Sequence, residues 1–137
     1  MKLNIEIKKG LGDIRFDMPI EDVVSILGEA NEVESIDNAA DEITTVLHYT
    51  DDGVTLFFEG TTPTLQCIDI SCDDATLFGE KIFDMGEKEL VKLLVKNNYC
   101  SQDIENEDWG ERRVSFIEGN LDFFFEHDEL MSVVYGK

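Results

Sequence analysis

The stretch VTLFFE at residues 54–59 returns as LDFFFE at residues 121–126, 67 positions further along the chain. The same offset aligns LGDIRFDMPIEDVVSIL at residues 11–27 with FGEKIFDMGEKELVKLL at residues 78–94. Chance produces single matches of this kind, but it rarely produces several in the same order with one common offset. The sequence therefore indicates an internal repeat.

The repeat divides the chain into residues 1–72 and residues 73–137. Neither unit is long enough to bury a large core alone, so we expect both to share one compact domain. The sequence of each unit predicts a leading strand, an amphipathic helix and three further strands. Those further strands are predicted at residues 45–50, 54–59 and 64–71 in the first unit, and at 112–117, 121–126 and 130–135 in the second.

The helix of the first unit is indicated by apolar side chains at helical spacing. Ile20, Val23, Val24 and Leu27 fall on one stripe, which predicts a helix that buries one face. Gly28 is a natural stop for this helix. The equivalent stripe in the second unit consists of Leu90, Val91 and Leu94.

The remaining segments complete the predicted architecture. LNIEI at residues 3–7 alternates as a strand, and we expect it to precede the first unit as residues 64–71 precede the second. The polar connection at residues 29–42 is predicted to contain a short helix near residues 38–42. Turn sequences such as DDG favour antiparallel hairpins. The predicted fold class is α+β, with two tandem helix-plus-three-strand repeats that form a largely antiparallel sheet with the helices on one face.

Strand alternation assigns side chains to the two faces of this sheet. Phe58 and Phe125 should point at the helices, so Phe57 and Phe124 occupy equivalent places on the opposite, mostly polar face. Aromatic rings rimmed by carboxylates suit protein recognition. The alternative is that the rings lie under a loop or a dimer partner. The candidate partner-binding residues are His48, Phe57, Glu59, Asp69, Trp109, Asp122, Phe124 and Glu126.

Trp109 lies in NEDWGERR, within the polar connection of the second unit. A Trp in an acidic loop either contacts a partner or folds back to cap the core. Because a large apolar ring more often finds a buried place, we expect Trp109 to cap the core.

The net charge of the chain limits the classes of partner that it is expected to bind. The formal net charge is −20, and residues 16–80 contain no Lys or Arg but 16 Asp or Glu. This excess of negative charge argues against binding to nucleic acids or to anionic membranes, because both attract basic surfaces. One explanation of the acidic stretch is solubility. The other is a surface shaped for a basic protein partner.

The cysteines and the N-terminal segment bear on location. Cys67, Cys72 and Cys100 are odd in number and lack CxxC spacing, so we expect reduced thiols that are buried as small apolar groups. MKLNIEIKKG lacks the apolar core of a signal peptide, and no run of about 18 apolar residues is present. We therefore expect a cytoplasmic protein without a membrane-spanning segment.

Catalytic motifs are absent from the sequence. It contains no GxSxG, HExxH, Walker A or GxGxxG pattern. EHDE at residues 126–129 gathers possible metal ligands, but a solvated hairpin tip explains it better. We therefore expect no catalytic residues, cofactor or metal site.

The pattern FDM..ED.VSILGE, followed by LHYTDDGVTLFFE and IDI, resembles two groups of tandem-repeat α+β proteins. These are the beta-lactamase-inhibitor-protein-like and the SmpA/OmlA-like families. The resemblance implies a helix packed on an antiparallel sheet, and a binding protein that uses the sheet face. In general character the chain is also similar to immunity proteins of bacterial toxin systems, which implies a basic protein as partner.

Three functional hypotheses remain open at this point. The first is a non-enzymatic acidic binding protein, an inhibitor or immunity protein that blocks a basic partner through its exposed sheet face. The second is a structural or regulatory module that forms a homodimer through a sheet edge or face. The third is a small enzyme that uses acidic residues with a divalent metal.

Overall fold

The computed structural model of the protein describes residues 1–37, 43–107 and 109–137. Within these residues the helices are α1 (Ile20–Leu27) and α2 (Glu87–Lys96), with 3-10 turns η1 (Ile82–Asp84) and η2 (Ile117–Gly119). A five-stranded sheet has the order β3-β2-β1-β8-β9. Its strands are β1 (Asn4–Glu6), β2 (Gly10–Leu11), β3 (Ile14–Arg15), β8 (Thr76–Leu77) and β9 (Glu80–Lys81).

A second, eight-stranded sheet has the order β10-β11-β12-β13-β7-β6-β5-β4. All its neighbouring strands are antiparallel. Its strands are β4 (Glu32–Asp37), β5 (Ile43–Tyr49), β6 (Val54–Glu59), β7 (Thr64–Ile70), β10 (Gln102–Asn106), β11 (Glu111–Phe116), β12 (Leu121–Glu126) and β13 (Glu129–Gly136). The fold is therefore of the α+β class.

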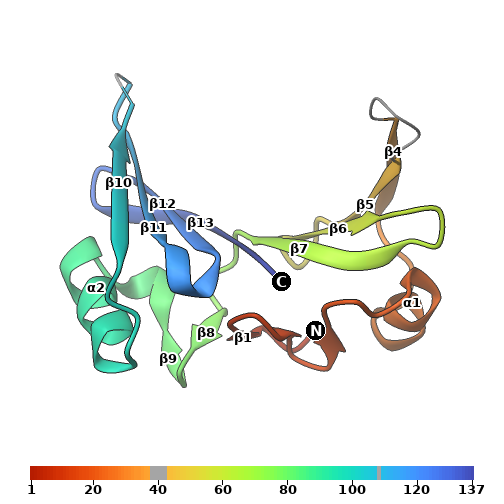
Figure 1. Cartoon of the computed structure of the whole chain (residues 1–137), viewed down its shortest axis with the longest axis horizontal. Coiled ribbons are helices and arrows are strands. Elements are labelled where there is room, and N and C mark those ends of the chain that lie inside the picture. The colour runs from red at the N-terminus through yellow and green to blue at the C-terminus, as the bar shows by residue number, and fades with distance from the viewer. Residues whose placement is uncertain (38–42, 108) are drawn as a thin grey trace.

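The large sheet is strongly curved. Figure 1 shows its two ends, at β4 and β10, rising on the same side of the central strands β7 and β13. The helices and the small sheet lie on the other side. The ladder shifts register between Phe57 and Phe58 in β6 and between Phe124 and Phe125 in β12. Because β-bulges increase local bending and twist, these two irregularities help to give the sheet one concave face.

The core fills the space between the convex side of the large sheet and the helices and small sheet. Alternation in β6 and β12 is confirmed, because Phe58 and Phe125 are almost fully buried. Val23 of α1 and Leu90 and Leu94 of α2 supply the buried helix stripes. Residues from both halves of the chain belong to one continuous hydrophobic cluster. One core thus supports the whole curved sheet.

Polar contacts fix the small sheet and α2 against this core. The buried hydroxyl of Tyr135 in β13 donates a hydrogen bond of 2.8 Å to the carbonyl oxygen of Gly10 in β2. The ring of Tyr135 also packs edge-on against Phe16, with centroids 5.9 Å apart. On α2, Glu87 accepts two hydrogen bonds from the guanidinium of Arg112, at 2.5 and 3.2 Å. These contacts join elements that are distant in sequence.

The prediction of three strands after each helix is wrong, because four follow. The additional strands, β4 and β10, lie within the connections that we predicted to be polar loops. Every residue of β4 and β10 is exposed, so no alternation of apolar side chains marks them. Backbone hydrogen bonds to β5 and β11 hold them at the two edges. The short helix predicted near residues 38–42 lies outside the described residues.

The leading strand at residues 3–7 is also placed differently from the prediction. As β1 it pairs in parallel with β8 and antiparallel with β2, so it belongs to the small sheet. It therefore does not occupy a place like that of β7 in the large sheet. Ile5 in β1 and Ile7 just after it are buried and cover the core from the side opposite the concave face.

Candidate functional site

A continuous row of paired residues crosses the concave face from one edge of the sheet to the other. In order, this central row consists of Asp103, Ser115, Asp122, Val134, Asp69, Thr55, His48 and Glu32. Directly paired residues point to the same side of a sheet, so the eight side chains share the concave face. The row brings three of the candidate residues, His48, Asp69 and Asp122, onto one surface.

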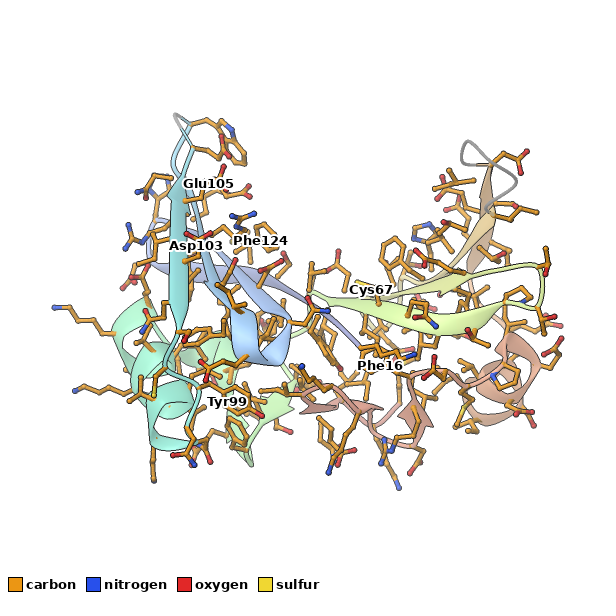
Figure 2. All side chains as sticks on the ribbon, viewed as in Figure 1. Phe16, Cys67, Tyr99, Asp103, Glu105 and Phe124 are labelled. Atoms are coloured by element: carbon orange, nitrogen blue, oxygen red, sulfur yellow. The ribbon has the colours of Figure 1, made fainter. Side chains whose placement is uncertain are left out.

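Two shorter rows flank the central row. One consists of Glu105, Arg113, Phe124 and Ser132. The other consists of Glu34, Val46, Phe57 and Cys67. Phe124 and Phe57 are both half-buried, and each stands one strand away from the central pair β7–β13. Figure 2 shows Asp103, Glu105, Phe124 and Cys67 on the open side of the sheet, whereas Phe16 lies below it. We call these three rows, together with Glu59, Glu111 and Glu126, the concave face.

Asp69 occupies the centre of this face, on strand β7. Its side chain is half-buried, and its Oδ1 atom is fully buried without a hydrogen-bond partner in the described part of the chain. Burial raises the pKa of the Asp69 carboxyl above its usual value, because the low-dielectric surroundings disfavour the charged form. The carboxylate at the centre of the face is therefore held at a cost to stability.

This cost leads to a prediction for Asp69→Asn. The raised pKa means that Asp69 destabilises the fold when ionised, and that the penalty disappears as the pH falls through the raised pKa towards 3.8. We expect the Asn variant to melt about 2–4 °C higher than the wild type at pH 7. This gain should shrink as the pH is lowered.

Thermal melts followed by circular dichroism at several pH values measure this difference. Asp22→Asn is the matched control, because Asp22 is exposed in the first turn of α1 and its loss should leave the melting temperature equal or slightly lower. An Asp69→Asn variant that melts below the wild type at pH 7 would contradict the assignment of Asp69 as a destabilising carboxylate.

The ionised groups of the face leave a surplus of negative charge. Arg113 is already engaged, with Nη2 at 2.6 Å from Glu105 and 3.7 Å from Asp103. His48 Nε2 lies 2.9 Å from Oε1 of Glu34. Across the residues that the structure describes, no hydrogen bond or ion pair involves the side-chain carboxylates of Glu59, Asp122 and Glu126. The face as a whole therefore attracts cations.

Cys67 lies within this group of carboxylates. Burial raises the pKa of the Cys67 thiol, and the charges of Asp69, Asp122 and Glu59 raise it further. The thiol is therefore a weak nucleophile. Our prediction that the cysteines are buried is wrong, because Cys67 on the concave face and Cys72 beside the core are half-buried and Cys100 is exposed. The three cysteines are free thiols.

The structure brings together seven of the eight candidate residues and separates the eighth. His48, Phe57, Glu59, Asp69, Asp122, Phe124 and Glu126 lie on the concave face. Trp109 lies between β10 and β11 with 64% of its surface exposed, so the prediction that it caps the core is wrong. Trp109 belongs neither to the continuous hydrophobic cluster nor to the partly buried residues that pack against it.

Sequence reasoning missed several residues of the face. Cys67, Ser132 and Val134 belong to it as much as the candidates do. Alternation along β7 and β13 carries the necessary signal for all three, because Cys67 precedes Asp69 by two residues and Ser132 precedes Val134 by two. The alternation does not reveal which strands are neighbours at the centre of the sheet.

Two hollows open on this face. One, of about 300 Å³, is lined by Asp69, Glu111, Phe124, Glu126, Ser132 and Val134, together with Phe125 and Met131. The other, of about 460 Å³, includes Glu59, Cys67, Asp122 and Lys137. The Lys137 ammonium forms an ion pair of 2.9 Å with Asp17. Carboxylates, aromatic rings and other uncharged side chains thus line the first hollow, and none of the described residues that line it is cationic.

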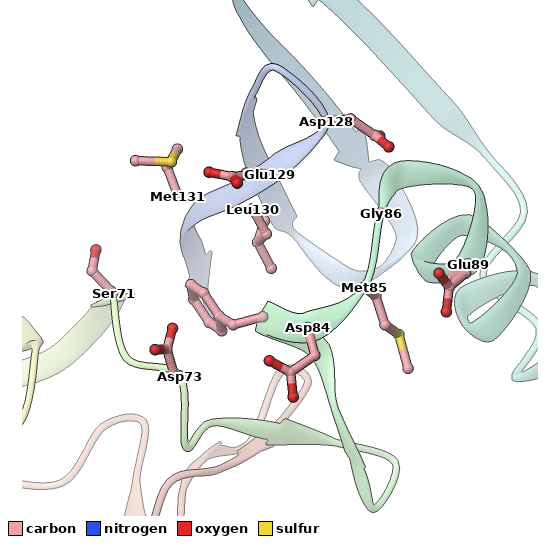
Figure 3. Close-up of a pocket in the computed structure, with 11 residues that line it drawn as sticks. Ser71, Asp73, Asp84, Met85, Gly86, Glu89, Asp128, Glu129, Leu130 and Met131 are labelled. Carbon is pink, nitrogen blue, oxygen red and sulfur yellow. The ribbon is translucent and has the colours of Figure 1, made fainter.

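A hollow of about 630 Å³ lies elsewhere, between η1, the start of α2 and the β12–β13 hairpin (Figure 3). Its carboxylates are Asp73, Asp84, Glu89, Asp128 and Glu129. Asp128 accepts a hydrogen bond of 3.0 Å from the backbone N–H of Glu87, so it caps the N-terminus of α2. Among the described residues, no group of three or more His, Cys, Asp or Glu side chains is suited to hold a metal ion.

The curved antiparallel sheet with helices on its convex side defines the protein as an α+β protein with one broad concave face. In the described part of the chain, no helix is long and apolar enough to span a bilayer. No protein-family model and no curated protein matches the sequence.

Two solved structures share the fold. One is the crystal structure of the uncharacterized protein YfeY from Escherichia coli, with a TM-score of 0.60, 12% sequence identity and full coverage of both chains. The other is an extracellular protein containing an SCP domain from Bacillus anthracis, with a TM-score of 0.51 and 15% identity. That match covers 97% of this chain and 50% of the other. At these identities the similarity concerns the fold alone.

Proposed function

We propose that the protein is a non-enzymatic binding protein whose concave face docks a basic protein partner. The observation that carries the proposal is the surplus of unpaired carboxylates around two half-buried aromatic rings, Phe57 and Phe124. Complementary charge speeds the encounter of two proteins, and aromatic side chains near the centre of an interface supply much of its affinity. The resemblance to inhibitor and immunity proteins fits this role, and we place the protein in the cytoplasm.

We further propose that the two halves of the face arose by duplication of one unit. Strands β6 and β12 have bounds that differ by the same 67 positions as the sequence repeat, and each is third from an end of the large sheet. The bulges at Phe57/Phe58 and Phe124/Phe125 show the same offset. A duplicated origin supports a single binding surface with one aromatic anchor from each unit, in the manner of the beta-lactamase-inhibitor-protein-like or SmpA/OmlA-like families.

The edges of the large sheet disfavour the alternative, a homodimer that forms through an edge strand. β4 presents Glu32, Glu34 and Asp37, and β10 presents Asp103 and Glu105. Two copies that met along these edges would bring like charges together, which is how many proteins protect an exposed edge from self-association.

Affinity capture from the source cell, including the product of the neighbouring gene, tests the proposed function. We expect the wild type to retain a basic protein that about 0.5 M salt releases, because the salt screens the attraction between charges. The double variant Phe57→Ala with Phe124→Ala should weaken binding at least about 30-fold.

Phe78→Ala is the matched control for this experiment. Phe78 is an aromatic residue with 41% of its surface exposed, but it follows β8 in the small sheet, on the opposite side of the molecule. Its loss should leave the affinity unchanged. A captured protein that withstands both the salt and the double variant would refute docking on the concave face.

A further inference from the structure

We propose that the basic partner inserts an arginine side chain into the hollow between Asp69 and Phe124. This inference rests on the proposed function and specifies the chemistry of the partner. It is carried by three observations: an unsatisfied carboxylate oxygen, a row of opposed acidic residues, and an aromatic ring beside them.

The first observation concerns hydrogen bonding. Within the residues that the structure describes, two buried side-chain polar atoms have no partner, namely Oδ1 of Asp69 and Nε of Arg113. Both residues lie on the concave face. Buried polar groups in native proteins are nearly always hydrogen-bonded, and an unsatisfied one calls for an explanation. Asp69 as a residue lines the hollow, so its carboxylate can pair there with a donor from the partner once a small side-chain rotation exposes the unsatisfied oxygen.

The second observation concerns like charges. Glu111 in β11 pairs directly with Glu126 in β12, and Glu126 pairs directly with Glu129 in β13. Carboxylates that oppose one another across strands destabilise a sheet. Glu111 and Glu126 line the same hollow as Asp69, so a cation placed there would offset the repulsion while it pairs with Asp69.

The third observation favours arginine over lysine. Phe124 lines the hollow with Asp69 and gives it an apolar aromatic wall. A guanidinium group stacks on an aromatic ring, donates in parallel to both oxygens of a carboxylate, and sheds its hydration more readily than an ammonium group. The chain's own Arg113 is directly paired with Phe124 but is tied to Asp103 and Glu105, so it leaves Asp69 to an external donor.

Titration with two capped peptides of equal charge, tetra-arginine amide and tetra-lysine amide, tests this inference on the full chain. Two-dimensional ¹H–¹⁵N NMR spectra report the site, and calorimetry reports the dissociation constant. We expect tetra-arginine to shift the amide signals of Asp69, Phe124 and Val134 and to bind at least about fivefold more tightly than tetra-lysine. Asp69→Asn should weaken its binding about tenfold.

The control variant is again Asp22→Asn, which removes one charge on the convex side and should leave both affinities within a factor of two. The inference is overturned if both peptides bind with equal affinity, or if Asp69→Asn and Asp22→Asn lose equal affinity for tetra-arginine. Either result would show that the peptides respond to net charge alone. If Asp69→Asn also retains the captured partner while the double Phe variant loses it, the arginine anchor is wrong and the proposed function stands. If the double Phe variant retains the partner, the proposed function fails.

Discussion

Phe58→Ala and Phe125→Ala should each lower the free energy of unfolding by about 3–5 kcal/mol. These two residues hold equivalent places in β6 and β12, and their rings are almost completely buried in the continuous core. Removing either ring takes away its burial and leaves a cavity that close-packed neighbours fill only in part. Urea denaturation followed by far-ultraviolet circular dichroism measures the loss.

The control for this experiment lies in the same strand. Phe57 precedes Phe58 but points to the concave face, where it is half-buried, so Phe57→Ala should cost less than about 1.5 kcal/mol. Because one core unites both halves, we expect a single unfolding transition in all three variants. Two separate unfolding transitions would show that the halves are energetically independent. A loss of unfolding free energy in only one of Phe58→Ala and Phe125→Ala would show the same.

Gly10→Ala should be similarly damaging, with a loss of about 3 kcal/mol or more in the free energy of unfolding. Gly10 has a φ of +155°, and a Cβ atom added there would lie 2.1 Å from the carbonyl oxygen of Ile14. The carbonyl oxygen belongs to the backbone of the tight β2–β3 hairpin and the added Cβ is bonded directly to that backbone, so neither atom can move aside. The carbonyl of Gly10 also accepts the hydrogen bond from Tyr135, and its displacement would weaken that link.

Gly79→Ala separates the two causes of this loss. Gly79 also has a positive φ, of +80°, but no atom in the described part of the chain lies within 4 Å of an added Cβ atom. Its substitution should cost only the backbone strain of about 1–2 kcal/mol. Equal losses for the two variants in thermal or chemical denaturation would mean that the close approach to Ile14 has no energetic consequence.

Alternation along the strands was the most informative signal in the sequence. It correctly placed Phe58 and Phe125 in the core and Phe57 and Phe124 on the other face, because the two sides of the large sheet meet different surroundings. It failed for β4 and β10, whose side chains are exposed on both sides. Val33 and Ile104, for example, have exposed fractions of 64% and 44%, so only backbone pairing defines these strands.

The sequence could predict which residues share the candidate site, but not which of their charged groups lack a partner or oppose one another. The unmet hydrogen bond of Asp69 depends on strand pairing, which places Val134 on one side of it and Thr55, whose hydroxyl lies 3.5 Å from His48 Nδ1, on the other. The opposition of Glu111 and Glu126 likewise depends on strand register. Trp109 shows that residue type alone can mislead, because a large aromatic ring favoured burial although this side chain is exposed.

The seam between β7 and β13 has a consequence for the kinetics of folding. It joins Asp69 to Val134, and the pairing of β1 with β8 joins Ile5 to Leu77, so both contacts close long stretches of chain. Hairpins within each half need only local encounters, whereas these two closures carry a larger entropic barrier. We therefore expect the hairpins within each half to form before the β7–β13 seam, and the closure of this seam to limit the rate at which the native protein appears.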